Sequence, residues 1–174
     1  MQILLTNRIA ERLRREMRKA GRREIGGLLL GEHIRDEVFR VAEISVQRSG
    51  GTHVSFVRDP REHRDQLAEF FTRTGGDYTR FNYLGEWHSH PSFEPTPSPE
   101  DLQTMQSIVE DPTVGVNFVT LLIASPVNGM TIQVSATAFR AGAPPLGISV
   151  AIEAGNDVPS GGGALRWLRR IFRM

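Results

Sequence analysis

The chain of 174 residues contains no cysteine, so it can form no disulfide and offers no thiolate as nucleophile or metal ligand. This absence also excludes the zinc site of the cytidine deaminases, which needs a Pro-Cys-x-x-Cys segment. No stretch approaches the roughly 20 apolar residues of a membrane-spanning helix. The first residues lack the charged and apolar regions of a signal peptide, so a cytoplasmic protein is expected.

Charge of neither sign prevails, since the net charge is +1 and both signs are spread along most of the chain. This balance argues against a nucleic-acid-binding protein. A basic cluster over residues 12–23 falls on an expected first helix, whose apolar residues Ile9, Leu13 and Met17 recur at every fourth position. The cluster is interpreted as a solvated helix face, and the alternative is a patch that binds an acidic protein surface.

The remaining hydrophobic pattern predicts an α/β fold, with one mixed β-sheet flanked by helices in a single domain. Two helices are expected after the first, over residues 59–74 and 99–110. Strands are expected over residues 25–30, 38–46, 81–88, 118–124 and 130–138, with a possible further strand at 53–57.

The most informative motif is His88-Ser89-His90, which stands at the end of the aromatic-rich strand expected over 81–88. Side chains two positions apart on a strand share a face, so the two histidines point the same way. Three prolines within residues 91–97 then make a stiff, extended loop. After the loop, Ser98 is a predicted helix N-cap, and Asp101 lies in the first helical turn, where the loop can bring it back to the histidines.

Two imidazoles and one carboxylate can hold a zinc ion and leave its fourth position open to water, which is the arrangement of catalytic zinc sites. Iron and manganese also accept this donor set. The other histidines, His33, His53 and His63, are interpreted as structural or solvated residues, with His63 on the apolar side of a helix. The motif therefore predicts a metal-dependent hydrolase.

Such a hydrolase needs a general base, and two glutamates are candidates. Glu86 lies two residues before His88, so strand alternation places it on the ligand face. Glu24 opens the apolar strand over 25–30, whose start could lie beside the metal. Spacing slightly favours Glu86 and leaves the choice open.

Glu24-Ile-Gly-Gly-Leu-Leu-Leu-Gly, followed downstream by Gly85-Glu-Trp-His-Ser-His-Pro, Ser98 and Asp101, resembles the JAMM (MPN+) metalloproteases. That family comprises deubiquitinating isopeptidases and their prokaryotic relatives. The resemblance implies an MPN-type fold, with His88, His90 and Asp101 as zinc ligands and Glu24 as general acid/base. It further implies that Ser98 helps to hold the oxyanion, and it leaves Glu86 as a supporting or entrance residue. All five motif positions are intact, which argues against the metal-free MPN branch.

The resemblance also implies a zinc-dependent isopeptidase or peptidase that cleaves after the C-terminal Gly of a ubiquitin-like protein. The expected partners are that protein, its conjugates and the conjugation enzymes, in a bacterial conjugation or antiphage defence system. The chain lacks the insertions with which larger members grip their substrate, so a strand edge near the metal is expected to pair with an extended tail. Two alternatives are a zinc hydrolase of short peptides or small amides, and a non-catalytic module that binds a ubiquitin-like protein.

The C-terminal part differs in composition from the rest. Residues 1–141 are expected to form the catalytic domain, and residues 142–163, rich in Gly and Pro, a linker. Residues 164–174 predict a basic amphipathic helix that docks on a partner or an anionic membrane surface. Docking onto its own domain or onto a second copy is the alternative.

Overall fold

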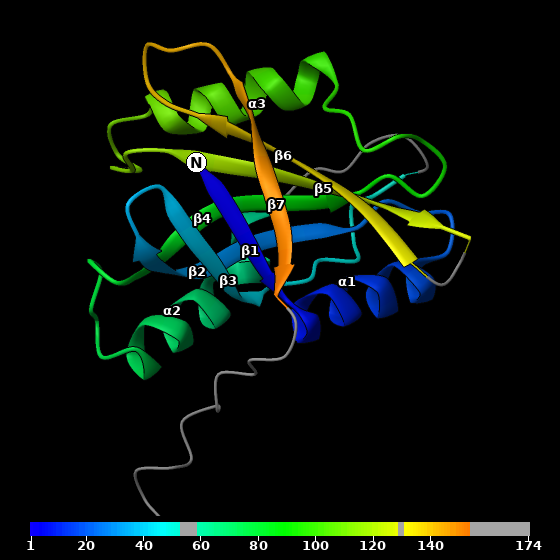
Figure 1. Ribbon diagram of the computed structural model, residues 1–174, viewed down its shortest axis with the longest axis horizontal. Coiled ribbons are helices and arrows are strands. Elements are labelled where there is room, and N and C mark those ends of the chain that lie inside the picture. The colour runs from blue at the N-terminus through cyan, green and yellow to red at the C-terminus, as the bar shows by residue number, and fades with distance from the viewer. Residues whose placement is uncertain (53–58, 129–130, 154–174) are drawn as a thin grey trace, which may run out of the picture.

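A computed structural model describes residues 1–52, 59–128 and 131–153. Its strands form one sheet that closes on itself in the order β1-β3-β2-β4-β5-β6-β7 (Figure 1). The sheet is mixed, since β1 runs parallel to β3 and β7, and β4 runs parallel to β5. The strands are β1 Gln2–Thr6, β2 Gly26–Arg35, β3 Val38–Ile44, β4 Phe81–Ser89, β5 Val119–Val127, β6 Thr131–Phe139 and β7 Leu146–Glu153.

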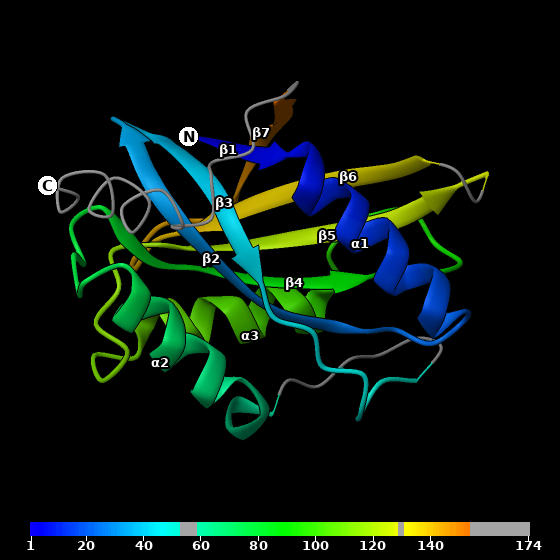
Figure 2. The ribbon, with the colours of Figure 1, turned by 90° about the horizontal axis from the view of Figure 1, so that it is seen from below.

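The helices cover the two faces of this sheet. They are α1 Asn7–Ala20, the short 3-10 helix η1 Pro60–His63, α2 Arg64–Arg73 and α3 Pro99–Glu110. Helix α1 packs on one face, and its stripe of Ile9, Leu13 and Met17 is buried, as predicted. Helices α2 and α3 pack on the other face (Figure 2). None of the described helices is long and apolar enough to cross a membrane.

The sequence pattern predicted most of these elements. The five main expected strands correspond to β2, β3, β4, β5 and β6, and the helix expected over 99–110 is α3. The helix expected over 59–74 begins with the 3-10 turn η1, which Asp59 caps by accepting the Arg61 N–H, and continues as α2. The α/β fold class is confirmed. The expected strand at 53–57 and the expected tail helix at 164–174 lie outside the described residues.

The prediction of a linker over 142–163 is wrong for residues 146–153, which form β7. This strand pairs antiparallel with β6 and parallel with β1, and so closes the sheet. The domain therefore extends beyond residue 141, to Glu153 at least. The prediction failed because the Gly and Pro content of the segment outweighed the alternation of Leu146, Ile148, Val150 and Ile152. Strand β1, which the sequence analysis did not predict, supplies the other edge that β7 joins.

Removal of β7 leaves β6 and β1 each with one unpaired edge and exposes the core beside Ile148 and Val150. A chain ending at residue 141 should therefore show no cooperative thermal unfolding by circular dichroism. A chain ending at residue 153 should unfold at the same midpoint as the full chain. A cooperative transition at the full-chain midpoint in the shorter variant would contradict the role given to β7.

Candidate metal centre

The pairing of β2 with β4 builds the foundation of the site. Gly26 lies opposite His88, and the same antiparallel register, continued by two residues, brings Glu24 level with His90. Directly opposite residues share a face of the sheet, so Glu24 is on the histidine side. Ser89 locks this register, because its Oγ accepts the Ile25 N–H at 3.1 Å and its own N–H donates to the Ile25 carbonyl at 2.8 Å.

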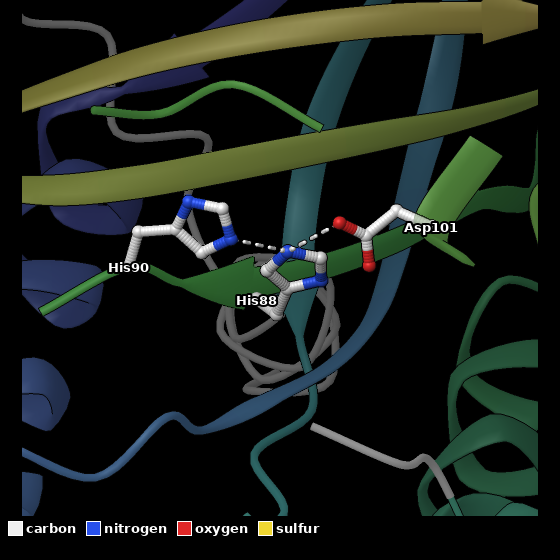
Figure 3. Close-up of side chains that lie close together, drawn as sticks. All are labelled: His88, His90 and Asp101. Atoms are coloured by element: carbon white, nitrogen blue, oxygen red, sulfur yellow. Dashed lines mark hydrogen bonds and ion pairs between the residues drawn. The ribbon is translucent and has the colours of Figure 1, made fainter. Parts of the chain in front are cut away.

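His88, His90 and Asp101 come together as the sequence predicted. One ligand atom from each lies within 4.8 Å of the others. The two Nε2 atoms are 3.1 Å apart, and His88 Nε2 is 3.8 Å from Asp101 Oδ2. Figure 3 shows the three side chains converging from the end of β4, the residue after it and the first turn of α3.

The hydrogen bonding and burial of the two imidazoles suit a metal. The Glu94 carbonyl can only accept, so His90 Nδ1 donates to it at 2.9 Å, which leaves Nε2 as the ring nitrogen that faces the predicted metal position. Burial lowers the pKa of His88 to about 4, although the Asp101 carboxylate raises it and the His90 charge lowers it. His88 is therefore neutral at pH 7, and its contact with Asp101 is not an ion pair. Two imidazoles and one carboxylate facing a common point fit a zinc ion.

Asp101 is held by the start of α3. Ser98 Oγ accepts the Asp101 N–H at 3.1 Å, and the Ser98 N–H and O–H both donate to Asp101 Oδ2 at 2.7 Å. This capping box confirms the predicted N-cap. It also commits the single hydroxyl proton of Ser98 to the carboxylate. The predicted contact with an oxyanion therefore requires this hydroxyl to turn away from Asp101.

The proline loop is fastened through three consecutive carbonyl groups. Ser125 Oγ donates to Phe93 O at 2.7 Å, His90 donates to Glu94 O, and Ser135 Oγ donates to Pro95 O. The Phe93 side chain is 53% exposed and stands edge-on to the His90 ring, with centroids 6.5 Å apart. The middle of the loop that connects the histidines to Asp101 is thus anchored to β5 through Ser125 and to β6 through Ser135.

The two candidate bases have different surroundings. Glu24 is only 4% exposed, and burial raises the pKa of its carboxyl; the His90 charge lowers this pKa, and the Asp101 charge raises it. Glu86 is also buried, and the Tyr83 hydroxyl donates to it at 3.4 Å. The electrostatic coupling of Glu24 to two of the predicted ligands supports Glu24 as the candidate base.

The remaining histidines lie outside the predicted ligand set where the structure describes them, as expected, but His63 contacts the polar side chains of Ser45 and Gln47 and not an apolar helix face. His33 stacks on Phe39 with centroids 5.0 Å apart, and His63 is buried at the end of η1. His53 lies outside the described residues. Sequence reasoning missed the supporting serines Ser89, Ser125 and Ser135, because only the strand register brings their hydroxyls to the site.

A closed mixed sheet with two histidines at the end of one strand and an aspartate on the following helix defines an MPN-type domain. Residues 6–139 match the model of a family described as prokaryotic homologs of the JAB domain, and the chain belongs to this family. The predicted fold and family are confirmed.

Individual relatives agree with this assignment. The chain is 31% identical over 109 residues to a CD-NTase/cGAS isopeptidase of Enterobacter hormaechei. This match covers 61% of this chain and 57% of the relative. It is 36% identical over 91 residues to a protein of the same name from Vibrio cholerae. This match covers 51% of this chain and 56% of the relative. The chain therefore spans just over half the length of these relatives. A solution structure of a protein from Desulfitobacterium hafniense shares the fold, with a TM-score of 0.65 and 19% identity over 89% of this chain and 95% of that one.

Replacement of Ser98 by Ala tests the capping box. The variant loses the N-cap and one of the hydrogen bonds to Asp101, so its free energy of unfolding should fall by about 1 kcal/mol. Zinc affinity should fall about 10- to 100-fold, because the carboxylate is less firmly oriented. Urea denaturation of the metal-free protein and competition with a chelator measure the two effects.

Ser107→Ala on the same helix is the control, since that hydroxyl donates to the Gln103 carbonyl, one turn away within α3. Unchanged zinc affinity in Ser98→Ala would show that the backbone N–H of residue 98 is enough to orient Asp101.

Proposed function

We propose that the protein is a zinc-dependent isopeptidase or peptidase that cleaves after the C-terminal Gly of a ubiquitin-like protein in the bacterial cytoplasm. The observation that carries the proposal is the convergence of Glu24 with His88, His90 and Asp101 on one face of the sheet. Membership of the JAB family and similarity to two proteins named CD-NTase/cGAS isopeptidase support the reaction and a setting in bacterial defence.

In this proposal His88, His90 and Asp101 hold the ion, which when bound would polarise the scissile carbonyl and acidify a water. Glu24 takes a proton from the attacking water and returns it to the leaving amine. A buried carboxyl with a raised pKa suits both steps, because its basicity lies closer to neutral pH than that of an exposed glutamate. Ser98 Oγ, once turned from Asp101, donates to the developing oxyanion.

The shape of the sheet limits where an extended substrate tail can pair. At the metal end of the sheet, β6 pairs with β5 along its whole length but with β7 only over residues 136–138. Within the described part of the chain, residues 131–135 of β6 therefore have no paired strand on one side, and Ser135 of this stretch also contacts the proline loop. The predicted pairing with a substrate tail is assigned to this edge.

Cleavage is tested directly with a panel of ubiquitin-like proteins, each extended beyond its terminal Gly and incubated with the zinc-loaded chain. Intact-mass spectrometry should show release after that Gly, and chelation should abolish it. Cleavage of short tail peptides at the same rate would point instead to a small-amide hydrolase. Binding of the ubiquitin-like protein without cleavage would point to a binding module.

The base assignment is tested by the pair Glu24→Gln and Glu86→Gln, which remove a carboxylate from the two candidate positions. Glu24→Gln should keep its zinc and its fold while kcat falls by about 10²- to 10⁴-fold, because proton transfer is lost. Glu86→Gln should keep most of the activity. Zinc content by atomic emission and thermal unfolding serve as controls, and the reverse pattern of activities would make Glu86 the base.

A further inference from the structure

A buried histidine outside the metal centre joins the segment that follows β3 to the start of the second helical region. His63 is 2% exposed, and both of its ring nitrogens are bonded. Its Nδ1 lies 2.7 Å from Ser45 Oγ, and its Nε2 lies 3.2 Å from Gln47 Oε1. Nothing in the proposed reaction uses this residue.

The direction of each bond follows from its neighbours. Gln47 Oε1 accepts the Asp59 N–H at 2.7 Å, and Gln47 Nε2 donates to Ser49 O at 3.0 Å, so the amide orientation is fixed. An amide oxygen only accepts, which places the His63 proton on Nε2. Ser45 Oγ lies at hydrogen-bond distance from the other ring nitrogen, Nδ1, so the one imidazole holds both side chains at once.

Ser45 and Gln47 in turn contact the two strands that carry the candidate metal centre. The Gln47 N–H donates to Gly26 O at 2.7 Å, and the Gly26 N–H donates to Gln47 O at 3.3 Å. Gly26 is the residue opposite His88 and stands two positions after Glu24. Ser45 Oγ accepts the Leu28 N–H at 2.7 Å, and Ser45 O accepts the Trp87 indole N–H at 2.8 Å. Ser45 thus accepts hydrogen bonds from both strands: from Leu28 of β2 and from Trp87 of β4, the residue before His88.

The same segment also holds Glu24 itself. The Glu24 N–H donates to Thr52 O at 2.8 Å. Gly51 lies so close that a Cβ there would collide with the Glu24 carbonyl oxygen. Residues 45–52 therefore pack against the start of β2 and hydrogen-bond to it. The His63 side chain contacts this segment at Ser45 and Gln47.

We propose that His63 is a positioning residue, which sets the place of Glu24 relative to His88, His90 and Asp101 through Gln47 and Gly26. Its effect on rate rests on the proposed function, whereas its effect on the position of Glu24 does not. Without the two His63 bonds, residues 45–52 are held less firmly against β2, and small displacements of a catalytic base reduce the rate strongly.

Three variants test the proposal. His63→Leu keeps apolar bulk and removes both bonds, so kcat should fall about 10- to 100-fold while KM and zinc stoichiometry stay unchanged. His63→Gln keeps an N–H that can reach Gln47 Oε1 and should recover most of the rate. Phe70→Leu is the matched control, because Phe70 is a buried α2 side chain that packs on Leu28 and Leu30 of the same strand. It should lower stability without lowering kcat.

Hydrogen exchange supplies a readout that needs neither zinc nor activity. In His63→Leu the Glu24 and Gln47 amides should exchange faster by a larger factor than the β5 amides, whereas Phe70→Leu should change them only in step with global stability. Normal kcat in an active His63→Leu, an equal kcat loss in Phe70→Leu, or unchanged local exchange would overturn the proposal. Faster local exchange in a chain whose wild type cleaves nothing would uphold the positioning role and reject the proposed function.

Discussion

The site depends on one pairing, the antiparallel contact between the start of β2 and the end of β4. This contact sets Gly26 opposite His88, and the reciprocal hydrogen bonds between Ser89 and Ile25 prevent the register from slipping. A slip by one residue would turn Glu24 to the α1 face of the sheet, away from the histidines. Ser89, the residue between the two histidines, thus joins the segment that carries the proposed base to the segment that carries two of the proposed metal ligands.

Burial at this end of the sheet shifts the pKa of an imidazole and the pKa of a carboxyl group in opposite directions. It keeps His88 neutral and ready to donate a lone pair, and it raises the pKa of the Glu24 carboxyl. Both shifts reflect the cost of holding charge in a poorly hydrated place. A divalent cation between the histidines and Asp101 would stabilise the charged forms of the nearby carboxyl groups. Such a cation would therefore offset part of the cost of burying Glu24.

The sequence predicted the parts of the site that are local along the chain. His88, His90, Ser98 and Asp101 lie within 14 residues, and strand alternation, proline stiffness and the N-cap pattern together place them. Glu24 was chosen by resemblance, because its position depends on a register between β2 and β4 that no local pattern specifies. The same limit explains why the polar contacts of His63 and the supporting serines were not foreseen. Strand β7 was missed for a different reason, since its glycine and the preceding prolines resemble a linker in composition alone.

The geometry of the centre follows from bonds within the protein. Asp101 is oriented by the backbone and hydroxyl of Ser98, and His90 by the carbonyl of Glu94. The loop between them is fixed by Ser125 and Ser135, which belong to two further strands of the closed sheet. Zinc fingers, in contrast, acquire their fold only when the metal binds. Because each predicted ligand has its own support in the sheet or in α3, we expect the fold to form without the metal, so that effects of substitutions on stability and on metal affinity can be measured separately.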